Sequence, residues 1–279
     1  MIAIILALSG AAAYGVSDFF GGIVGRRATP WAVAAAGGLG GALASVALTA
    51  LDPGHPAAID LAWGAVAGIG NGIGTAFLYR GLSSGRMGVV APVSGVLAAI
   101  VPIAVAVATG ERPGPLVWLG IVSAVPAIWL VAQEPMSDSG HPATTASGTR
   151  DGILAGLGFG GLFACLGQVA DGAGFSPLVL NQLVGVLVVA LAATALRTTW
   201  VPRGPAWGGI LAGLLGGVAT AAFVLAAQRG LLSVSTVLTS LYPAFTIMLA
   251  ALVLHERVHG IQAWGMALCG AAVVLVALG

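Results

Sequence analysis

Asp18 is the residue whose setting most clearly suggests chemistry, because this acid stands well inside a long apolar stretch. An Asp at the middle of a membrane helix costs roughly 2.5 to 3.5 kcal/mol, so it is expected to face a wet cavity or a partner. Tyr14, Ser17 and Asp18 have the spacing i, i+3, i+4, which places them on one helical face. We expect Asp18 to contact an amine on a ligand or to exchange a proton. The alternative is an ion pair with Arg26 or Arg27 near the membrane interface.

The composition indicates an integral membrane protein. Only 7% of the 279 residues are charged and 58% are hydrophobic, whereas soluble domains carry about 25% charged residues. The apolar residues form stretches long enough to cross a bilayer core of roughly 30 Å. All ten basic residues are arginine and form no cluster, so no nucleic-acid partner is expected. Cys165 and Cys269 lie in apolar runs and are expected to be small core residues.

Windows of about 20 apolar residues predict an all-α membrane protein with ten transmembrane helices. Residues 133–151 are rich in Ser, Thr, Gly and Pro and are expected to be a hydrophilic linker between two five-span units, 1–132 and 152–279. The predicted helices lie at 2–24, 31–51, 61–79, 87–109, 115–132, 152–170, 177–196, 206–227, 233–254 and 260–278.

The two units share a weak internal repeat. Arg80, followed by Gly-Leu, recurs as Arg229, and Glu111, followed by Arg, recurs as Glu256. Because five is an odd number of spans, two similar units must insert in opposite orientations. Inverted repeats of this kind are the architecture of alternating-access transporters.

Three motifs resemble the EamA branch of the drug/metabolite transporter superfamily. They are the aromatic-Gly-Ser-polar pattern at Tyr14-Gly15-Val16-Ser17-Asp18-Phe19, the Leu-x-Pro element at Leu241-Tyr242-Pro243, and the Gly-Glu-Arg helix ending at Gly110-Glu111-Arg112. In the second half His255 stands where this last pattern has Gly. The resemblance covers nearly the whole chain and implies a permease for small metabolites, commonly amino acids or their analogues. The substrate itself does not transfer with the fold.

Two further groups of polar residues could line a binding cavity, because residues four apart stack on one helical face. They are Asn71, Thr75 and Tyr79 in the third span, and Thr236, Ser240 and Tyr242 in the ninth. The alternative for both groups is close helix packing or interhelical hydrogen bonding.

Four charged residues stand at span ends. Arg80 and Arg229 end the third and eighth spans, where a cation complements the helix dipole and can reach water. We expect them to be structural anchors or, alternatively, gate residues at opposite membrane faces. Glu111 and Glu256 each precede an Arg just after a span and are likewise expected to be structural or gate residues, with Glu256 in an interfacial ion pair with Arg257.

The segment from His255 to His259 matches H-E-x-x-H, a zinc-binding pattern of metalloproteases when both histidines share a helical face. A zinc site would need a third ligand. The residues after His259 contain no Asp, Glu or His, and their one thiol, Cys269, lies inside an apolar run. The repeat explains Glu256 without zinc, because Glu111 occupies the same place in the first half. These two observations disfavour a zinc site. An intramembrane zinc metalloprotease that uses His255 and His259 is kept as the alternative to a permease.

The expected function is secondary active transport across the plasma membrane, with export favoured, and a proton is the candidate coupling ion. Arginines stand only near span ends, so neutral or cationic amphiphiles or amino acids are expected as substrates rather than anions. No cofactor, metal or catalytic residue is expected.

The glycines from Gly156 to Gly161 match a dinucleotide fingerprint by letters, but they lie in an apolar helix and are expected to serve helix packing.

The distribution of arginine among the loops predicts how the chain is oriented in the membrane. The loops after odd-numbered spans hold eight of the ten arginines, so the positive-inside rule predicts that both termini face outward. The family resemblance implies the reverse. A C-terminal reporter that fluoresces only in the cytoplasm separates the two orientations, because it stays dark if the charge-based orientation holds.

Overall fold

The computed structural model describes residues 1–25, 27–83, 87–132, 145–255 and 258–279, and these form helices and connections without a strand. The helices begin at residues that favour a helix start, since Pro30, Pro115, Pro177 and Pro243 each stand in a first turn. The elements are α1 (Ile2–Gly25), α2 (Pro30–Leu51), α3 (Ala58–Ser83), α4 (Met87–Ala108), α5 (Pro115–Val131), α6 (Thr145–Leu166), α7 (Ser176–Ala195), the short 3-10 helix η1 (Gly204–Gly208), α8 (Gly209–Arg229), α9 (Leu232–Thr239), α10 (Tyr242–Val253) and α11 (Gly260–Leu278).

Seven helical segments of the described chain are long and apolar enough to cross a membrane. Two shorter apolar helices, Val93–Ala108 and Pro115–Val131, accompany them. The all-helical membrane architecture is therefore confirmed, whereas the count of ten spans remains a prediction. The helix predicted to begin at residue 152 begins earlier, at Thr145.

The helix predicted over 233–254 is interrupted. α9 ends at Thr239 and α10 begins at Tyr242. The cause is Pro243, which has no backbone N–H to donate to Thr239 and whose ring crowds the carbonyl four residues earlier. Such broken helices are tolerated at membrane depth when other helices enclose them.

The helix contacts have the pattern expected for two halves related by a two-fold axis, since the main contacts of one half have their counterparts in the other. α3 packs against α6 and α7, while α8 packs against α1 and α2. The second helices of the two halves, α2 and α7, pack together, as do the last helices, α5 and α11. α2 and α7 run antiparallel, because Gly38 lies against Val186 and Gly41 against Gln182. Counterparts that pair antiparallel give the two halves opposite orientations, as the repeat predicts.

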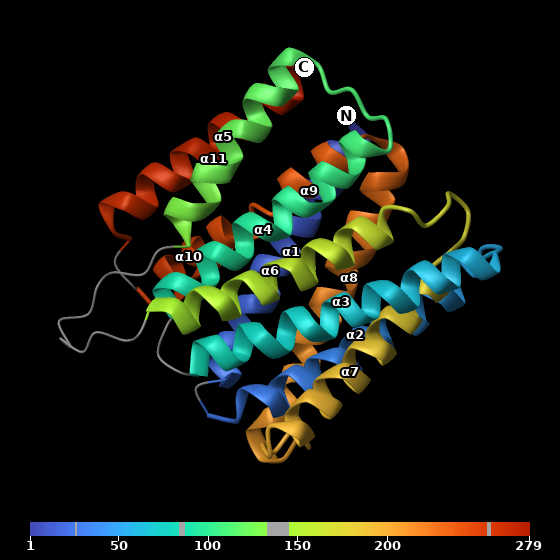
Figure 1. Cartoon of the computed structure of the whole chain (residues 1–279), viewed down its shortest axis with the longest axis vertical. Coiled ribbons are helices and arrows are strands. Elements are labelled where there is room, and N and C mark those ends of the chain that lie inside the picture. The colour runs from blue at the N-terminus through green and yellow to red at the C-terminus, as the bar shows by residue number, and fades with distance from the viewer. Residues whose placement is uncertain (26, 84–86, 133–144, 256–257) are drawn as a thin grey trace.

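Figure 1 shows the resulting bundle, with the α5–α11 pair at one edge and the α2–α7 pair at the other. Both termini lie at one end, together with Arg112 and Arg229. The opposite end, here called the arginine-rich end, carries the α1–α2 and α7–α8 connections. Its described arginines are Arg27, Arg80, Arg150, Arg197 and Arg203.

Glycines allow the backbones of the two halves to touch. A Cβ on Gly213 of α8 would lie 1.8 Å from the carbonyl oxygen of Gly37 in α2, and a Cβ on Gly158 of α6 would lie 2.5 Å from the backbone nitrogen of Gly74 in α3. The packing role predicted for the glycines around Gly158 is thus confirmed. Small residues at such crossings are the usual means by which membrane helices associate.

We expect Gly213→Ala to lower the thermal unfolding temperature of the purified protein, because the new methyl group forces α8 away from α2. Overpacking of this kind costs about 1 to 3 kcal/mol. Gly270→Ala is the matched control, since a Cβ at this exposed glycine of α11 meets no atom within 4 Å. Equal unfolding temperatures for the two variants in a detergent-based melting assay would contradict the close α2–α8 contact.

Candidate functional site

Four helices from both halves meet around Tyr14. Its hydroxyl and that of Thr220 in α8 are hydrogen bonded at 2.7 Å. Its ring stands edge-on to Phe163 of α6, with centroids 6.2 Å apart, and lies 6.1 Å from the ring of Tyr242 in α10. We call these four residues the Tyr14 junction. It brings together the predicted site residues Tyr14 and Tyr242, whereas Phe163 and Thr220 were not predicted.

A glycine sets the distance between α1 and α10 at this junction. A Cβ on Gly15 would lie 2.4 Å from the Cβ of Phe245 and 3.0 Å from the carbonyl oxygen of Tyr242. Only a glycine permits this approach, which brings the Tyr14 and Tyr242 rings to within 6.1 Å of each other, centre to centre.

The other two polar residues of α1 have different surroundings. Ser17 donates a hydrogen bond of 2.7 Å to the carbonyl oxygen of Ala212 in α8 and so fixes α1 against α8. Asp18 is exposed, yet it lies close enough to Tyr14 and Tyr242 to act on both electrostatically. Asp18 is thus an exposed acid one turn after Tyr14 on α1, near the Tyr14 junction. No ion pair joins Asp18 to Arg27 in the described chain, and Arg26 lies outside the described residues.

The predicted group in the ninth span lies at the break between α9 and α10. Thr236 and Ser240 are almost fully buried, at 0% and 1% exposure. Their hydroxyls have no hydrogen-bond partner among the described residues. Their neighbour Thr239 donates to the carbonyl oxygen of Ala7 in α1 at 3.4 Å. A buried hydroxyl without a partner is costly, so Thr236 and Ser240 offer two groups that a ligand or water could satisfy.

The predicted group in the third span is not brought to the Tyr14 junction by any described contact. Asn71 packs against α7, where a Cβ on Gly185 would lie 3.1 Å from its Nδ2. Thr75 is half-buried. The side chain of Tyr79 lies outside what the structure describes.

The two arginines at equivalent repeat positions have different partners. Arg80 forms an ion pair with Asp151 at the start of α6, and its guanidinium lies 4.5 Å from the centre of the Phe77 ring. Arg229 is exposed and donates to the carbonyl oxygen of Leu225 in its own helix at 3.2 Å. The structure therefore gives Arg80 a contact between the two halves, through an acid that the sequence analysis assigned to the linker.

Glu111 forms no ion pair with Arg112 among the described contacts. The Glu111 carboxylate instead accepts hydrogen bonds from the backbone N–H of Leu232 and from the N–H and hydroxyl of Ser233, the latter two at 3.1 and 2.6 Å. These donors form the first turn of α9, where unpaired N–H groups and the helix dipole favour an anion. Arg112 donates to the carbonyl oxygen of Glu111 at 2.8 Å and to that of Val107 at 3.0 Å. The ion pair expected between Glu256 and Arg257 falls outside the described residues.

The zinc-protease alternative loses its structural premise. His255 has a φ of 56°, outside helical geometry, and follows the end of α10. His259 is the N-cap of α11. The two histidines therefore do not share a helical face, because the described part of the segment between α10 and α11 is not helical. No group of three or more metal-binding side chains occurs in the described chain.

Asp60 is a buried acid that the sequence analysis did not single out. Its carboxylate accepts from the N–H of Ala57 at the start of α3 and from the N–H of Ala170 in the α6–α7 connection, both at 2.9 Å. Gln228 of α8 donates to the carbonyl oxygen of the same Ala170 at 2.9 Å. These bonds fasten the halves together at the end that holds the termini. The signal in the sequence was an acid directly before a predicted span.

Comparison with known proteins agrees with this architecture. The sequence profile of the EamA-like transporter family matches residues 1–133 and 152–278. A solved structure, described only as a crystal structure of a protein, superposes with a TM-score of 0.76 at 16% identity and covers 99% of this chain and 96% of its own. At that identity the similarity concerns the fold alone. No curated protein matches the chain.

Removal of the Glu111 carboxylate is expected to destabilise the protein. Glu111→Ala leaves the first turn of α9 uncapped, and loss of a helix cap costs about 1 to 2 kcal/mol, so its melting temperature falls. Glu111→Gln keeps one acceptor oxygen and gives a smaller decrease. The control is Arg112→Gln, whose exposed side chain contacts only local carbonyls. A melting curve of Glu111→Ala that overlays the unmodified protein would refute the capping role.

Proposed function

The chain belongs to the EamA-like transporter family, whose members are membrane transporters of small molecules, and from this premise we propose that it is a secondary active transporter. It exports small metabolites across the plasma membrane by alternating access between its inverted halves. The observation that carries the proposal is the position of Asp18, an exposed acid in a membrane-spanning helix, one turn after Tyr14 and near a junction built from both halves.

The side chains of the junction favour an amine-bearing or aromatic substrate. The Tyr14, Tyr242 and Phe163 rings gather at the junction, edge-on or tilted to one another, and a cation over the face of an aromatic ring gains about 0.5 to 2 kcal/mol. Asp18 supplies a negative charge beside it. The described arginines stand near helix ends, so an anion finds no basic partner at the junction. Amino acids and neutral or cationic amphiphiles are therefore the proposed substrates.

The unpartnered hydroxyls of Thr236 and Ser240 support this site from the second half. They lie at a broken helix, and transporters built from inverted repeats commonly bind substrate or ions at such breaks near the bilayer midplane. A ligand at this position contacts α1 from one half and α9 and α10 from the other. Relative motion of the halves then opens the ligand to one side of the membrane at a time.

The proposal gives Asp18 a role in coupling. Residues 152–166 of α6, the counterpart of α1, contain no acidic residue, so the site has one carboxylate instead of two. A carboxylate that binds either a proton or a substrate amine, but not both, exchanges one for the other in each transport cycle.

Asp18→Asn tests this role, because it keeps the size and polarity of the side chain but removes its charge and titration. The assay uses proteoliposomes with tetraphenylphosphonium as the cationic probe and a mixture of neutral amino acids as the second probe. We expect accumulation driven by a proton gradient to fall at least tenfold, while counterflow persists if Asp18 acts in coupling alone.

Asp52→Asn is the matched control, since Asp52 is an exposed acid outside the bundle interior and should leave transport unchanged. Proton-driven accumulation by Asp18→Asn at the unmodified rate and pH dependence would remove Asp18 from the mechanism. No flux of any probe by the unmodified protein would argue against these substrate classes.

A further inference from the structure

A cavity lies at the arginine-rich end, between the α1–α2 and α7–α8 connections, and has no part in the proposed transport site. Its volume is about 360 Å³. Tyr14 and Arg27 are thirteen residues apart, which corresponds to roughly 20 Å along a helix at 1.5 Å per residue. The cavity is therefore a separate site at the surface level of the membrane.

The polar lining of this cavity is basic and rich in hydroxyls. Arg27 and Arg203 line it together with Thr29, Thr198 and Thr199, and its lining contains no acid. The Thr29 hydroxyl donates to the carbonyl oxygen of Thr199 at 3.1 Å, which ties the two connections together. Neither arginine forms an ion pair with an acid of the described chain. The cavity therefore has positive charge that the described chain leaves unneutralised.

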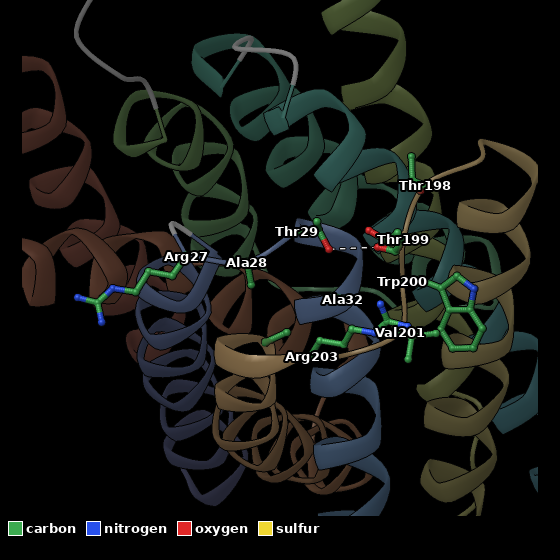
Figure 2. Close-up of a pocket in the computed structure, with 10 residues that line it drawn as sticks. Arg27, Ala28, Thr29, Ala32, Thr198, Thr199, Trp200, Val201 and Arg203 are labelled. Atoms are coloured by element: carbon green, nitrogen blue, oxygen red, sulfur yellow. Dashed lines mark hydrogen bonds between the residues drawn. The ribbon is translucent and has the colours of Figure 1, made fainter.

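Figure 2 shows that the two arginines contribute differently. The Arg203 side chain runs beneath Val201 toward Trp200, whereas Arg27 extends outward on the opposite side, away from the Thr29–Thr199 bridge. Both arginines line the cavity, and Arg203 is the one whose side chain extends along the side that holds Val201 and Trp200. A planar guanidinium presents paired N–H donors that match the oxygens of a phosphate.

The rest of the lining is apolar. Ala28, Ala32, Val201 and Ala206 supply it, and Val201 is 51% exposed. Trp200 completes this side, with its indole N–H donating to Thr194 at 3.1 Å. Tryptophan with one apolar and one polar side is typical of the membrane interface. A soluble anion makes no use of an apolar wall, whereas a glycerolipid places its backbone and first methylene groups against one.

We propose that this cavity binds the phosphate headgroup of an anionic phospholipid, with Arg203 as the principal contact and Arg27 as a second charge at the rim. The α2–α7 pair that bears the cavity lies at an edge of the bundle (Figure 1), where lipid has access. Basic pockets between helix ends are a common form of headgroup site. The bound lipid joins the α1–α2 connection of one half to the α7–α8 connection of the other.

The test compares melting temperatures of the full-length protein in mixed micelles that contain phosphatidylglycerol or phosphatidylcholine at equal mole fraction. Phosphatidylglycerol is expected to raise the melting temperature by roughly 3 to 6 °C more than phosphatidylcholine, as a ligand at about ten times its dissociation constant would. Arg203→Gln should abolish this difference, and Arg203→Lys, which keeps the charge, should retain part of it. The same difference should shrink in high salt.

Arg150→Gln is the matched control, because Arg150 is an exposed arginine at the same end but outside the cavity lining. Equal stabilisation by both lipids, or equal loss in Arg203→Gln and Arg150→Gln, would overturn the proposal. A further arm adds inorganic phosphate or glycerol phosphate without anionic lipid. If either produces the full shift, and Arg203→Gln removes it, the site takes a soluble phosphate and the lipid assignment is wrong.

Discussion

The structure depends on close backbone contact between two inverted halves. In lipid, apolar side chains gain nothing by leaving their solvent, so helices associate through packing and hydrogen bonds between them. Gly213 against Gly37, and Gly158 against Gly74, bring the backbones of opposite halves together. A side chain larger than hydrogen at these crossings would separate the helices that shape the Tyr14 junction. The glycine content of the chain is therefore a requirement of the fold rather than a sign of flexibility.

In the part of the chain that the structure describes, the contacts between the halves that involve a charged side chain lie near the ends of the bundle. Arg80 with Asp151 joins them at the arginine-rich end, and Asp60 and Glu111 join them at the other. Between these levels lie the Tyr14 junction and the exposed Asp18, and the junction is bordered by the break between α9 and α10. The arrangement leaves the hydroxyls of Thr236 and Ser240 available to a ligand, while the ends are held by charged contacts. An alternating-access cycle requires that the contacts at one end break while those at the other persist.

Much of this architecture could be predicted from the sequence, since apolar runs in lipid must form helices that satisfy their own backbone groups. The long apolar run correctly predicted that Tyr14, Ser17 and Asp18 lie in one helix. Spacing does not fix how a helix is rotated against its neighbours, which is why Asn71 contacts α7 and no described contact links it to the junction. Contacts between residues far apart in the sequence could not be predicted either. Glu111 caps a helix that begins 121 residues later. Asp151, which was assigned to the linker, pairs with Arg80.

The central claim, that the two halves have opposite orientations, is tested most directly by labelling equivalent helix ends. Asp52 and Leu196 are the exposed C-caps of the counterparts α2 and α7. Each is replaced singly by cysteine in a chain whose Cys165 and Cys269 are changed to alanine, and sealed vesicles are treated with a membrane-impermeant maleimide. The inverted architecture predicts that one site reacts in intact vesicles and the other only after permeabilisation. Labelling of both sites from the same side of the membrane would contradict it.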